Sequence, residues 1–353
     1  MKLYEKLKEL SIEVKEVDLE RNEKQVSEDF KRVTTTVKLK GLGETGYGEE
    51  VCWDEEEHEK LQEHVGELEL DQGHTLEDFS ERLSPQDLFF GQEPGREDYR
   101  NYRTWAFESA ALDLALKQKG ISLAEALGRE YSPLNFVASP GLGNPPGIEP
   151  VQKIQEQADV GLKLDATSKW GDELVQKLSE SGKVRIIDLK GHYEDEEVRQ
   201  EADPELYRKM VENFPDALIE DPVLNDETRP VLEDERERIT WDEPITSVGS
   251  IKKLPFKPRK INIKPSRFGS IRKLLDAIEY CLNNEIEMYG GGQFELSKGR
   301  EHIHAIASIF YPESANDIAP RNFNSQEPEN LVEPPIIVKN GNEGLEWSFT
   351  EEA

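Results

Sequence analysis

A series of charged residues stands within or directly after short apolar runs of the chain, and their types suit acid–base chemistry at a metal ion. Asp188 follows VRII, Glu220 follows ALI, Asp242 follows ITW, Lys264 follows INI, and Lys163 lies within VGLKLD. Carboxylates are the hard oxygen ligands that Mg²⁺ prefers, and a lysine beside positive charge has a lowered pKa and can act as a base. The residue types therefore predict a Mg²⁺ site with three carboxylate ligands and lysine bases beside it.

Strands and helices are predicted to alternate through the part of the chain that carries these residues. From about residue 135, short apolar runs alternate with amphipathic stretches, and the five positions are separated by 25, 32, 22 and 22 residues. This spacing is typical of βα units, and eight such runs in about 185 residues favour a closed barrel over an open sheet. Because the carboxyl ends of barrel strands open on one face, we expect the charged residues to converge there.

The first part of the chain predicts an α+β unit. Residues 33–40 alternate like a strand, residues 41–48 predict a turn, and residues 49–53 predict the returning strand of a hairpin. Residues 103–118 have an apolar face at helical spacing, and Gly120 closes this predicted helix.

Composition excludes several classes of partner. The chain has 74 acidic and 44 basic residues and a net charge of −30, and such a surface repels nucleic acid and anionic membranes. No apolar run approaches the ~18 residues of a membrane span, and the first residues lack the apolar core of a signal peptide. We therefore expect a cytoplasmic protein with neither nucleic-acid nor membrane partners. Cys52 and Cys281 are too few for a disulfide framework or a four-thiolate zinc site.

Four segments resemble the enolase superfamily, in particular its muconate-lactonizing-enzyme and mandelate-racemase-like members. These segments are GLGETGYGEEV (41–51), ALDLALKQKGISLAEALG (111–128), INIKPSRFGSI (261–271) and ANDIAP (315–320). The resemblance covers most of the chain and implies an α/β fold, a (β/α)7β TIM-type barrel with an N-terminal α+β capping domain. The implied limits are residues 1–130 for the capping domain and 131–320 for the catalytic barrel, with a C-terminal tail, residues 321–353, packing back on the cap.

The resemblance also implies an activity and roles for individual residues. The activity is Mg²⁺-dependent abstraction of the α-proton of a small carboxylate substrate through an enediolate, by a racemase, epimerase or cycloisomerase that is a homo-oligomer. The alternatives are a β-eliminating lyase, such as a dehydratase or a succinylbenzoate-synthase-like enzyme, and a catalytically silent barrel that acts as a binding or scaffold protein. Asp188, Glu220 and Asp242 match the metal ligands of the family, and Lys264 matches one of its catalytic lysines.

The second barrel strand departs from the family pattern. The family usually has Lys-x-Lys there, with the second lysine as the base, whereas this chain has Lys163 and Asp165. Lys190, two residues after Asp188, stands where the family more often has asparagine. We predict that the amine has moved to the third strand, so that Lys190 faces Asp165 and either Lys163 or Lys190 opposes Lys264. The alternative is an ion pair between Lys163 and Asp165, with Lys190 a solvated loop residue.

Further positions are candidates for contact with the substrate. Three glycines at 290–292 allow close backbone approach to a ligand, although they also suit a tight barrel corner. The pattern GLGETG at 41–46 lacks the helix that a dinucleotide site needs, and in the resembled family a cap loop of this kind closes over the substrate. We expect specificity from residues 21–32 and 45–48 of the cap. The candidate substrate-binding residues are Asp165, Glu243, Gln293, Glu295 and Tyr47.

Overall fold

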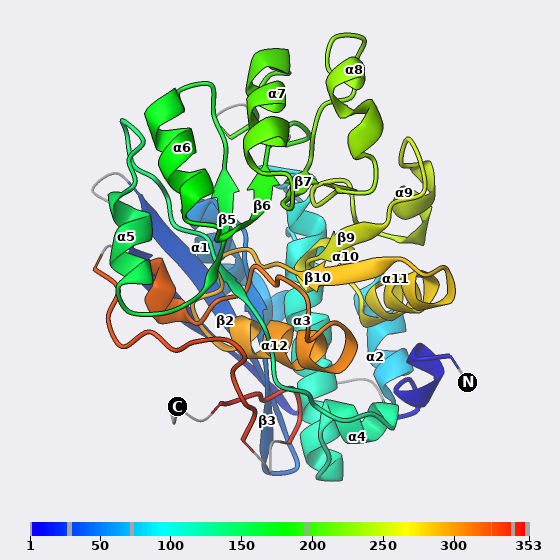
Figure 1. Ribbon diagram of the computed structural model, residues 1–353. Helices are drawn as coiled ribbons and strands as arrows, with labels where there is room; N and C mark the ends of the chain where they lie inside the picture. Colours follow the sequence, from blue (N-terminus) through cyan, green and yellow to red (C-terminus); the bar gives the residue numbers. More distant parts are fainter. Residues whose placement is uncertain are drawn as a thin grey trace.

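An antiparallel sheet and one long helix form the N-terminal part of the chain (Figure 1). The computed structural model describes residues 2–26, 30–70, 74–193, 195, 198–325, 327–339 and 343–349. Strands β1 (Glu16–Gln25), β2 (Lys31–Gly41) and β3 (Glu44–Glu50) pair in that order, and helix α3 (Tyr99–Lys119) packs on β2 and β3. The shorter helices of this part are η1 (Tyr4–Lys6), α1 (Glu55–His64), η2 (Val65–Glu67), α2 (Leu76–Leu83) and α4 (Leu123–Leu127).

Glycines allow the β2–β3 hairpin to lie directly on α3. A Cβ atom at Gly46 would lie 2.2 Å from the carbonyl oxygen of Ala110, and one at Gly48 would lie 1.9 Å from that of Ala106. The predicted hairpin is confirmed, but its turn is shorter than the predicted eight residues. Leu42 and Gly43 alone form it, with φ of 52° and 88°.

Seven short parallel strands run through the described residues of the second part of the chain. Strands β4 to β8 make one sheet in sequence order, and β9 and β10 make a second sheet. All of their pairings are parallel, as the alternation of strands and helices predicted. The strands are β4 (Val137–Ala138), β5 (Gly161–Asp165), β6 (Val184–Asp188), β7 (Leu218–Glu220), β8 (Ile239–Thr240), β9 (Lys260–Ile263) and β10 (Glu287–Gly290).

Single backbone contacts join the two sheets into a closed ring. The amide of Asn262 donates to the carbonyl of Trp241 at 3.0 Å and thereby joins β9 to the end of β8. Gly291, directly after β10, forms a parallel bridge with Asp317, and the amide of Val137 in β4 donates to the carbonyl of Asn316 at 2.8 Å. The segment around residues 316–317 therefore takes the place of the eighth strand of the barrel.

Helices connect the barrel strands and cover their outer faces (Figure 1). Helix α7 begins as its sequence requires, because the Asp203 carboxylate accepts hydrogen bonds from the amides of Glu205 and Leu206 and Pro204 occupies the first helical position. The helices of this part are α5 (Glu149–Gln155), α6 (Asp172–Glu180), α7 (Pro204–Asn213), α8 (Arg229–Leu232), η3 (Glu233–Glu235), α9 (Val248–Lys253), α10 (Pro265–Phe268), α11 (Ile271–Asn283), α12 (Lys298–Phe310) and η4 (Arg321–Asn324).

The described part of the C-terminal tail contacts both parts of the molecule. Leu345 donates its amide to Asp113 of α3 at 2.7 Å, and the amide of Leu123 in α4 donates to the carbonyl of Gly344 at 3.0 Å. Ile336 pairs with Leu134, just before β4. Among the described residues, no helix has both the length and the apolar character that crossing a membrane requires.

Candidate active site

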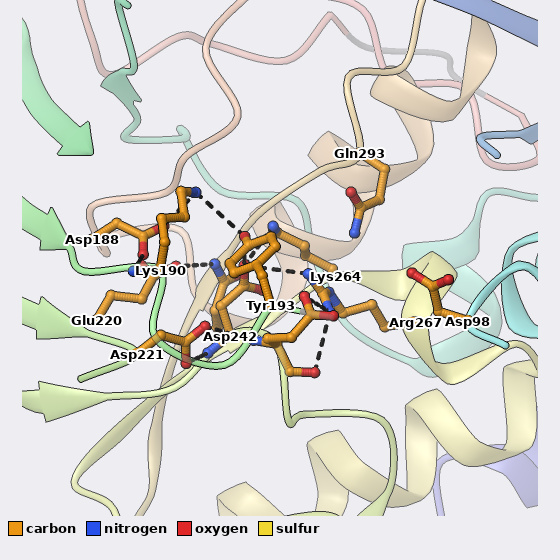
Figure 2. Close-up of polar contacts among 12 residues, drawn as sticks. Asp98, Asp188, Lys190, Tyr193, Glu220, Asp221, Asp242, Lys264, Arg267 and Gln293 are labelled. Atoms are coloured by element: carbon orange, nitrogen blue, oxygen red, sulfur yellow. Dashed lines mark hydrogen bonds and ion pairs between the residues drawn. The ribbon is translucent and has the colours of Figure 1, made fainter. Parts of the chain in front are cut away.

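Three buried carboxylates gather where β6, β7 and β8 end, and we call Asp188, Glu220 and Asp242 the carboxylate cluster (Figure 2). The register of the parallel strands places Asp188 beside Glu220, and each of the three residues is 0% exposed. Charges at such positions are costly unless they are paired or bind a metal ion. The groups around the cluster therefore determine its chemistry.

Lys163 lies within the barrel and contacts two members of the cluster. Its Nζ is 2.6 Å from Glu220 Oε1, 3.3 Å from Asp188 Oδ2 and 3.4 Å from Asp317 Oδ2. Burial alone would lower the pKa of Lys163, but these three carboxylates raise it well above its ordinary value. Lys163 is therefore an ammonium ion that offsets the negative charge of the cluster.

The negative charge of Glu220 is the least compensated by nearby cations in the cluster. Tyr289 donates its hydroxyl to Glu220 Oε2 at 2.6 Å, and the Asn262 amide lies 3.5 Å from Oε1. Burial raises the pKa of Glu220 to about 7, with Lys163 opposing this rise and the nearby Asp188 and Asp242 adding to it. The charged form of Glu220 therefore depends on the ammonium of Lys163.

Asp242 is held by two cations that follow β9. Lys264 Nζ lies 2.6 Å from Asp242 Oδ2, and Arg267 Nη2 lies 3.5 Å from the same oxygen. Arg267 also forms an ion pair with Glu243, the predicted substrate-binding residue next to Asp242. Burial alone would raise the pKa of Asp242, but Arg267 and Lys264 bring it far below its ordinary value.

Lys190 occupies the rim of the cluster and contacts the acid of the second strand. Its Nζ is 2.7 Å from Asp188 Oδ2 and 3.3 Å from Asp165 Oδ1. Asp165 itself is half-exposed, with 52% of its side chain accessible. The ion pairs of the described residues include none between Lys163 and Asp165, because Lys163 contacts the deeper acids. The structure thus places Lys190, and not Lys163, opposite Asp165.

Several residues that sequence reasoning missed complete the site. Tyr193 donates its hydroxyl to Asp242 Oδ2 at 3.1 Å and accepts a hydrogen bond from Lys190 at 3.3 Å. Asp221 accepts the amides of Asp242 and Glu243, both at 2.9 Å, and so fixes the backbone after β8. Two further residues at the site had a signal in the sequence. Side chains alternate along a strand, so Asn262 points to the same side as Lys264, and Asp317 lies within the segment ANDIAP. Tyr193 and Arg267 lie outside the barrel strands, where no periodicity indicates them.

The structure does not bring three predicted substrate-binding residues into contact with the cluster. The ring of Tyr47 lies 4.7 Å from Lys117 Nζ and 5.7 Å from Lys298 Nζ, beside α3 and α12. Glu295 forms an ion pair with Arg300 at 3.3 Å. Gln293 donates to the hydroxyl of Tyr102 at 2.9 Å and is drawn apart from the dashed network in Figure 2. Contact of these three side chains with a substrate stays a prediction.

The residues at the cluster fit a divalent cation. Among the described residues, no three His, Cys, Asp or Glu side chains already surround a single point as metal ligands do, because lysine amines stand between the acids. Asp242 Oδ1, however, is buried and accepts no hydrogen bond. A buried carboxylate oxygen without a partner, beside two further carboxylates, is the donor set that Mg²⁺ takes.

Comparison with known proteins identifies the family and the fold. Residues 5–126 match the family model described as "Domain of unknown function (DUF8230) N-terminal domain", and residues 130–325 match its C-terminal domain. The o-succinylbenzoate synthase of Bacillus subtilis is 28% identical over 244 residues, which are 66% of this chain and 63% of that protein. This match therefore spans less than two thirds of the length of the relative.

Solved structures resemble the whole chain at low sequence identity. A member of the enolase superfamily from Listeria innocua has a TM-score of 0.68 and 21% identity, over 96% of this chain and 95% of that one. A dipeptide epimerase from Methylococcus capsulatus complexed with Mg ion has a TM-score of 0.60 and 16% identity, over 96% of this chain and 100% of that one. The chain belongs to the DUF8230 family, and it has the enolase-superfamily fold of an N-terminal cap and a TIM-type barrel.

Proposed function

We propose that this chain is a Mg²⁺-dependent enzyme that abstracts the α-proton of a carboxylate substrate. One observation carries the proposal: the amines of Lys190 and Lys264 contact different members of the carboxylate cluster, Asp188 and Asp242. Amines beside a set of buried acids are the groups that proton transfer next to a carboxylate requires. The fold supports the proposal, because the solved relatives include an epimerase with a bound Mg ion.

Asp188, Glu220 and Asp242 would hold the metal ion. Mg²⁺ at this position supplies Lewis-acid stabilisation of the negative charge that develops on the substrate carboxylate. Lys163 maintains the arrangement of the acids, since its ammonium contacts Glu220 and Asp188 from within the barrel. Asp221 fixes the backbone of Asp242 and so determines the direction of that carboxylate.

Lys264 and Lys190 are the proposed acid–base pair. Lys264 would remove the α-proton to give the enediolate, and Lys190 would return a proton to the other side. Burial alone would lower the pKa of Lys190, but Asp165 and Asp188 raise it well above its ordinary value, and Lys190 would therefore begin as the proton donor. Lys163 is less suited to this role because three carboxylates engage it. A donor and an acceptor on different sides of the substrate suit a racemase, epimerase or cycloisomerase.

A β-eliminating lyase is the second candidate. The Bacillus subtilis relative is described as an o-succinylbenzoate synthase, and an elimination needs only one competent lysine. The rival outside catalysis is a barrel that binds a ligand without turnover, which the missing Lys-x-Lys pair favours. The proposed substrate in both catalytic cases is a small carboxylate.

Proton exchange in D₂O tests the proposal directly. We would incubate the protein with Mg²⁺ and a library of amino acids, dipeptides and hydroxy acids and measure deuterium incorporation by mass. Exchange that disappears in Asp242→Asn and Lys264→Met, but persists in the exposed-lysine control Lys177→Met, supports the proposal. Loss of one stereochemical direction in Lys190→Met indicates a racemase or epimerase, and unchanged exchange there indicates a single-lysine lyase. Mg²⁺ binding by calorimetry without exchange of any compound would favour the non-catalytic barrel.

Two structural expectations remain part of the proposal. The domain limits are a cap over residues 1–130 and a barrel over residues 131–320, with the tail from 321 packed on the cap. We also propose that the chain is cytoplasmic and that it is a homo-oligomer, and analytical ultracentrifugation of the purified chain tests the oligomeric state.

A further inference from the structure

A cavity of about 750 Å³ lies between the cap and the barrel, outside the carboxylate cluster. Tyr4 of η1, Ser80 of α2 and Glu108 of α3 line it from the cap, and Arg272 and Lys273 of α11 line it from the barrel. Figure 1 shows α2, α3 and α11 beside one another. None of the described lining residues belongs to the carboxylate cluster, and the volume is in the range of small-molecule sites, about 300–1,000 Å³.

Glu108 is a buried acid at this cavity, and it lacks a cation partner. The residue is 2% exposed, and its Oε2 accepts the amide of Ile271, at the start of α11, at 3.2 Å. In the part of the chain that the structure describes, Oε1 accepts no hydrogen bond and Glu108 forms no ion pair. Burial raises the pKa of Glu108 to about 7, and the nearby Ser80, the Ile271 amide and Arg272 oppose this rise only in part. One carboxylate oxygen is therefore available to a ligand.

Two hydroxyl groups that line the cavity are also without partners. The hydroxyl oxygens of Tyr4 and Ser80 are buried, and neither makes a hydrogen bond with a described residue. Tyr4 as a whole is only 3% exposed. Burial raises the pKa of Tyr4, and the charge of Glu108 raises it further, so these two groups lie near each other. Because buried polar groups are nearly always hydrogen-bonded, two unpaired hydroxyls beside an unpaired acid oxygen indicate a place for a polar group of a ligand.

The charges around the cavity favour a cationic ligand over an anionic one. Four acidic and three basic residues line it. Arg272 forms an ion pair with Glu77, and Arg100 pairs with two glutamates that do not line the cavity. The third basic residue, Lys273, is exposed to solvent, where its charge is screened. The negative charge of Glu108 thus stays uncompensated, and a buried charge is costly without a partner.

Another part of the cavity wall suits the hydrocarbon portion of a ligand. The side chains of Leu83, Leu88 and Phe89 line it and are otherwise buried in the cap. A primary ammonium group has three donors and no acceptor, which matches Oε1 of Glu108 and the two unpaired hydroxyl oxygens. A ligand with an ammonium group at one end and an alkyl or aromatic body would therefore satisfy both parts of the wall.

We propose that this cavity binds a small primary amine, whose ammonium group forms an ion pair with Glu108. Tyr4 and Ser80 accept the remaining hydrogen bonds of the ammonium group. Because Glu108 also accepts the first amide of α11, the bound amine would connect three elements of the cap to a helix of the barrel. The inference does not rest on the proposed function, since the carboxylate cluster takes no part in it.

Saturation-transfer NMR with benzylamine and its neutral counterpart, benzyl alcohol, tests this inference. The titrations are done at about pH 8, above the pKa of about 7 of Glu108, and at about 0.15 M salt, which screens distant surface charges. We expect benzylamine to bind about tenfold more tightly, the usual contribution of a hydrogen bond to a charged group. Glu108→Gln should remove this preference, and Tyr4→Phe should weaken benzylamine binding severalfold. Glu81→Gln, at an exposed residue of the same cavity, removes an equal charge and should keep the preference.

Three results would overturn the inference. The first is equal affinity for benzylamine and benzyl alcohol, or binding of neither. The second is a preference for the amine that Glu108→Gln leaves unchanged, with thermal melting showing that the variant is folded. The third is displacement of benzylamine by Mg²⁺, which would place the amine at the carboxylate cluster instead. If Glu108→Gln does not fold, Tyr4→Phe and the competition with Mg²⁺ decide the question.

Discussion

Lys190 Nζ lies 2.7 Å from Asp188 Oδ2, so this amine pairs with the carboxylate that ends the strand preceding it. The backbone of Lys190 makes this pairing possible by adopting a left-handed conformation with φ of 51°. Such a conformation is uncommon for lysine and more frequent for asparagine. The chain therefore accepts backbone strain in order to place an amine at the carboxylate cluster.

Replacement of Lys190 tests the relocation of this amine. We expect Lys190→Met to lower the rate of proton exchange by about 10²- to 10⁴-fold in the stereochemical direction that Lys190 serves, the usual contribution of a general acid or base, and to leave the direction served by Lys264 intact. Mg²⁺ affinity should be kept or increased, because Asp188 loses a competing cation. Exchange rates and calorimetric Mg²⁺ titration measure the two effects, with Lys177→Met as the exposed control. Full activity in Lys190→Met would show that Lys190 is only a loop residue.

Replacement of Lys163 should affect stability more than any exposed lysine does. Lys163→Met leaves Glu220 and Asp188 buried without their cation, and breaking a buried pair in this way costs about 3–5 kcal/mol of unfolding free energy. Added Mg²⁺ should restore much of this loss by replacing the missing positive charge. Urea denaturation with and without Mg²⁺ measures both values.

Lys183→Met provides the matched control for this experiment. Lys183 pairs with Asp159 at the surface, and loss of an exposed pair costs about 1 kcal/mol or less. If Lys163→Met were no more destabilising than this control, and were insensitive to Mg²⁺, the assigned role of Lys163 would be wrong.

Arg32 of the cap holds the loop that packs on Lys264. Its guanidinium, 0% exposed, donates to the carbonyls of Val51 at 2.8 Å and Gln293 at 2.9 Å, and so joins β3 of the cap to the segment after β10. We expect Arg32→Met to lower the unfolding free energy by about 3 kcal/mol or more, because several buried carbonyls lose a charged donor. Chemical denaturation measures the effect. Arg259→Met, at a largely exposed site, should change stability by less than about 0.5 kcal/mol.

The pH dependence of the unfolding free energy should reveal the contribution of the buried residue His304. Burial lowers the pKa of His304 from 6.5 to about 3, and the ring contacts the carbonyl of Ile318 through Nε2 at 2.7 Å. His304 takes up a proton near pH 6.5 in the unfolded chain, whereas in the folded chain it does so only near pH 3. The contribution of this residue to stability is therefore present above pH 6.5 and is lost as the pH falls toward 3.

Denaturation at several pH values measures this dependence. We expect the unfolding free energy of the wild-type chain to fall more steeply between pH 6.5 and 3 than that of His304→Gln. His74→Gln, at an exposed histidine, serves as the control and should follow the wild-type curve. Parallel curves for the wild type and His304→Gln would mean that His304 titrates normally in the folded chain.

Sequence patterns alone predicted the parallel barrel and the positions of its acidic residues. Apolar runs that end in a charge predict strands with buried sides, and parallel strands in a barrel all end on one face. Asp188, Glu220 and Asp242 therefore had to lie near one another once their strands were identified. The same pattern predicted that Lys163 and Lys264 belong to the site, because the position of a residue in a strand determines to which side its side chain points.

Tertiary structure alone decided which groups touch. Lys163 was a possible partner of Asp165 by strand alternation, but it reaches the deeper Glu220, and Asp165 pairs with Lys190 instead. The packing of β3 on α3 likewise decides that the ring of Tyr47 lies beside Lys117, while the contact of Tyr47 with a substrate stays a prediction. Lys24 and Asn324 meet across 300 residues of sequence. Local periodicity specifies which way a side chain points within its own element, whereas the packing of elements distant in sequence specifies what that side chain meets.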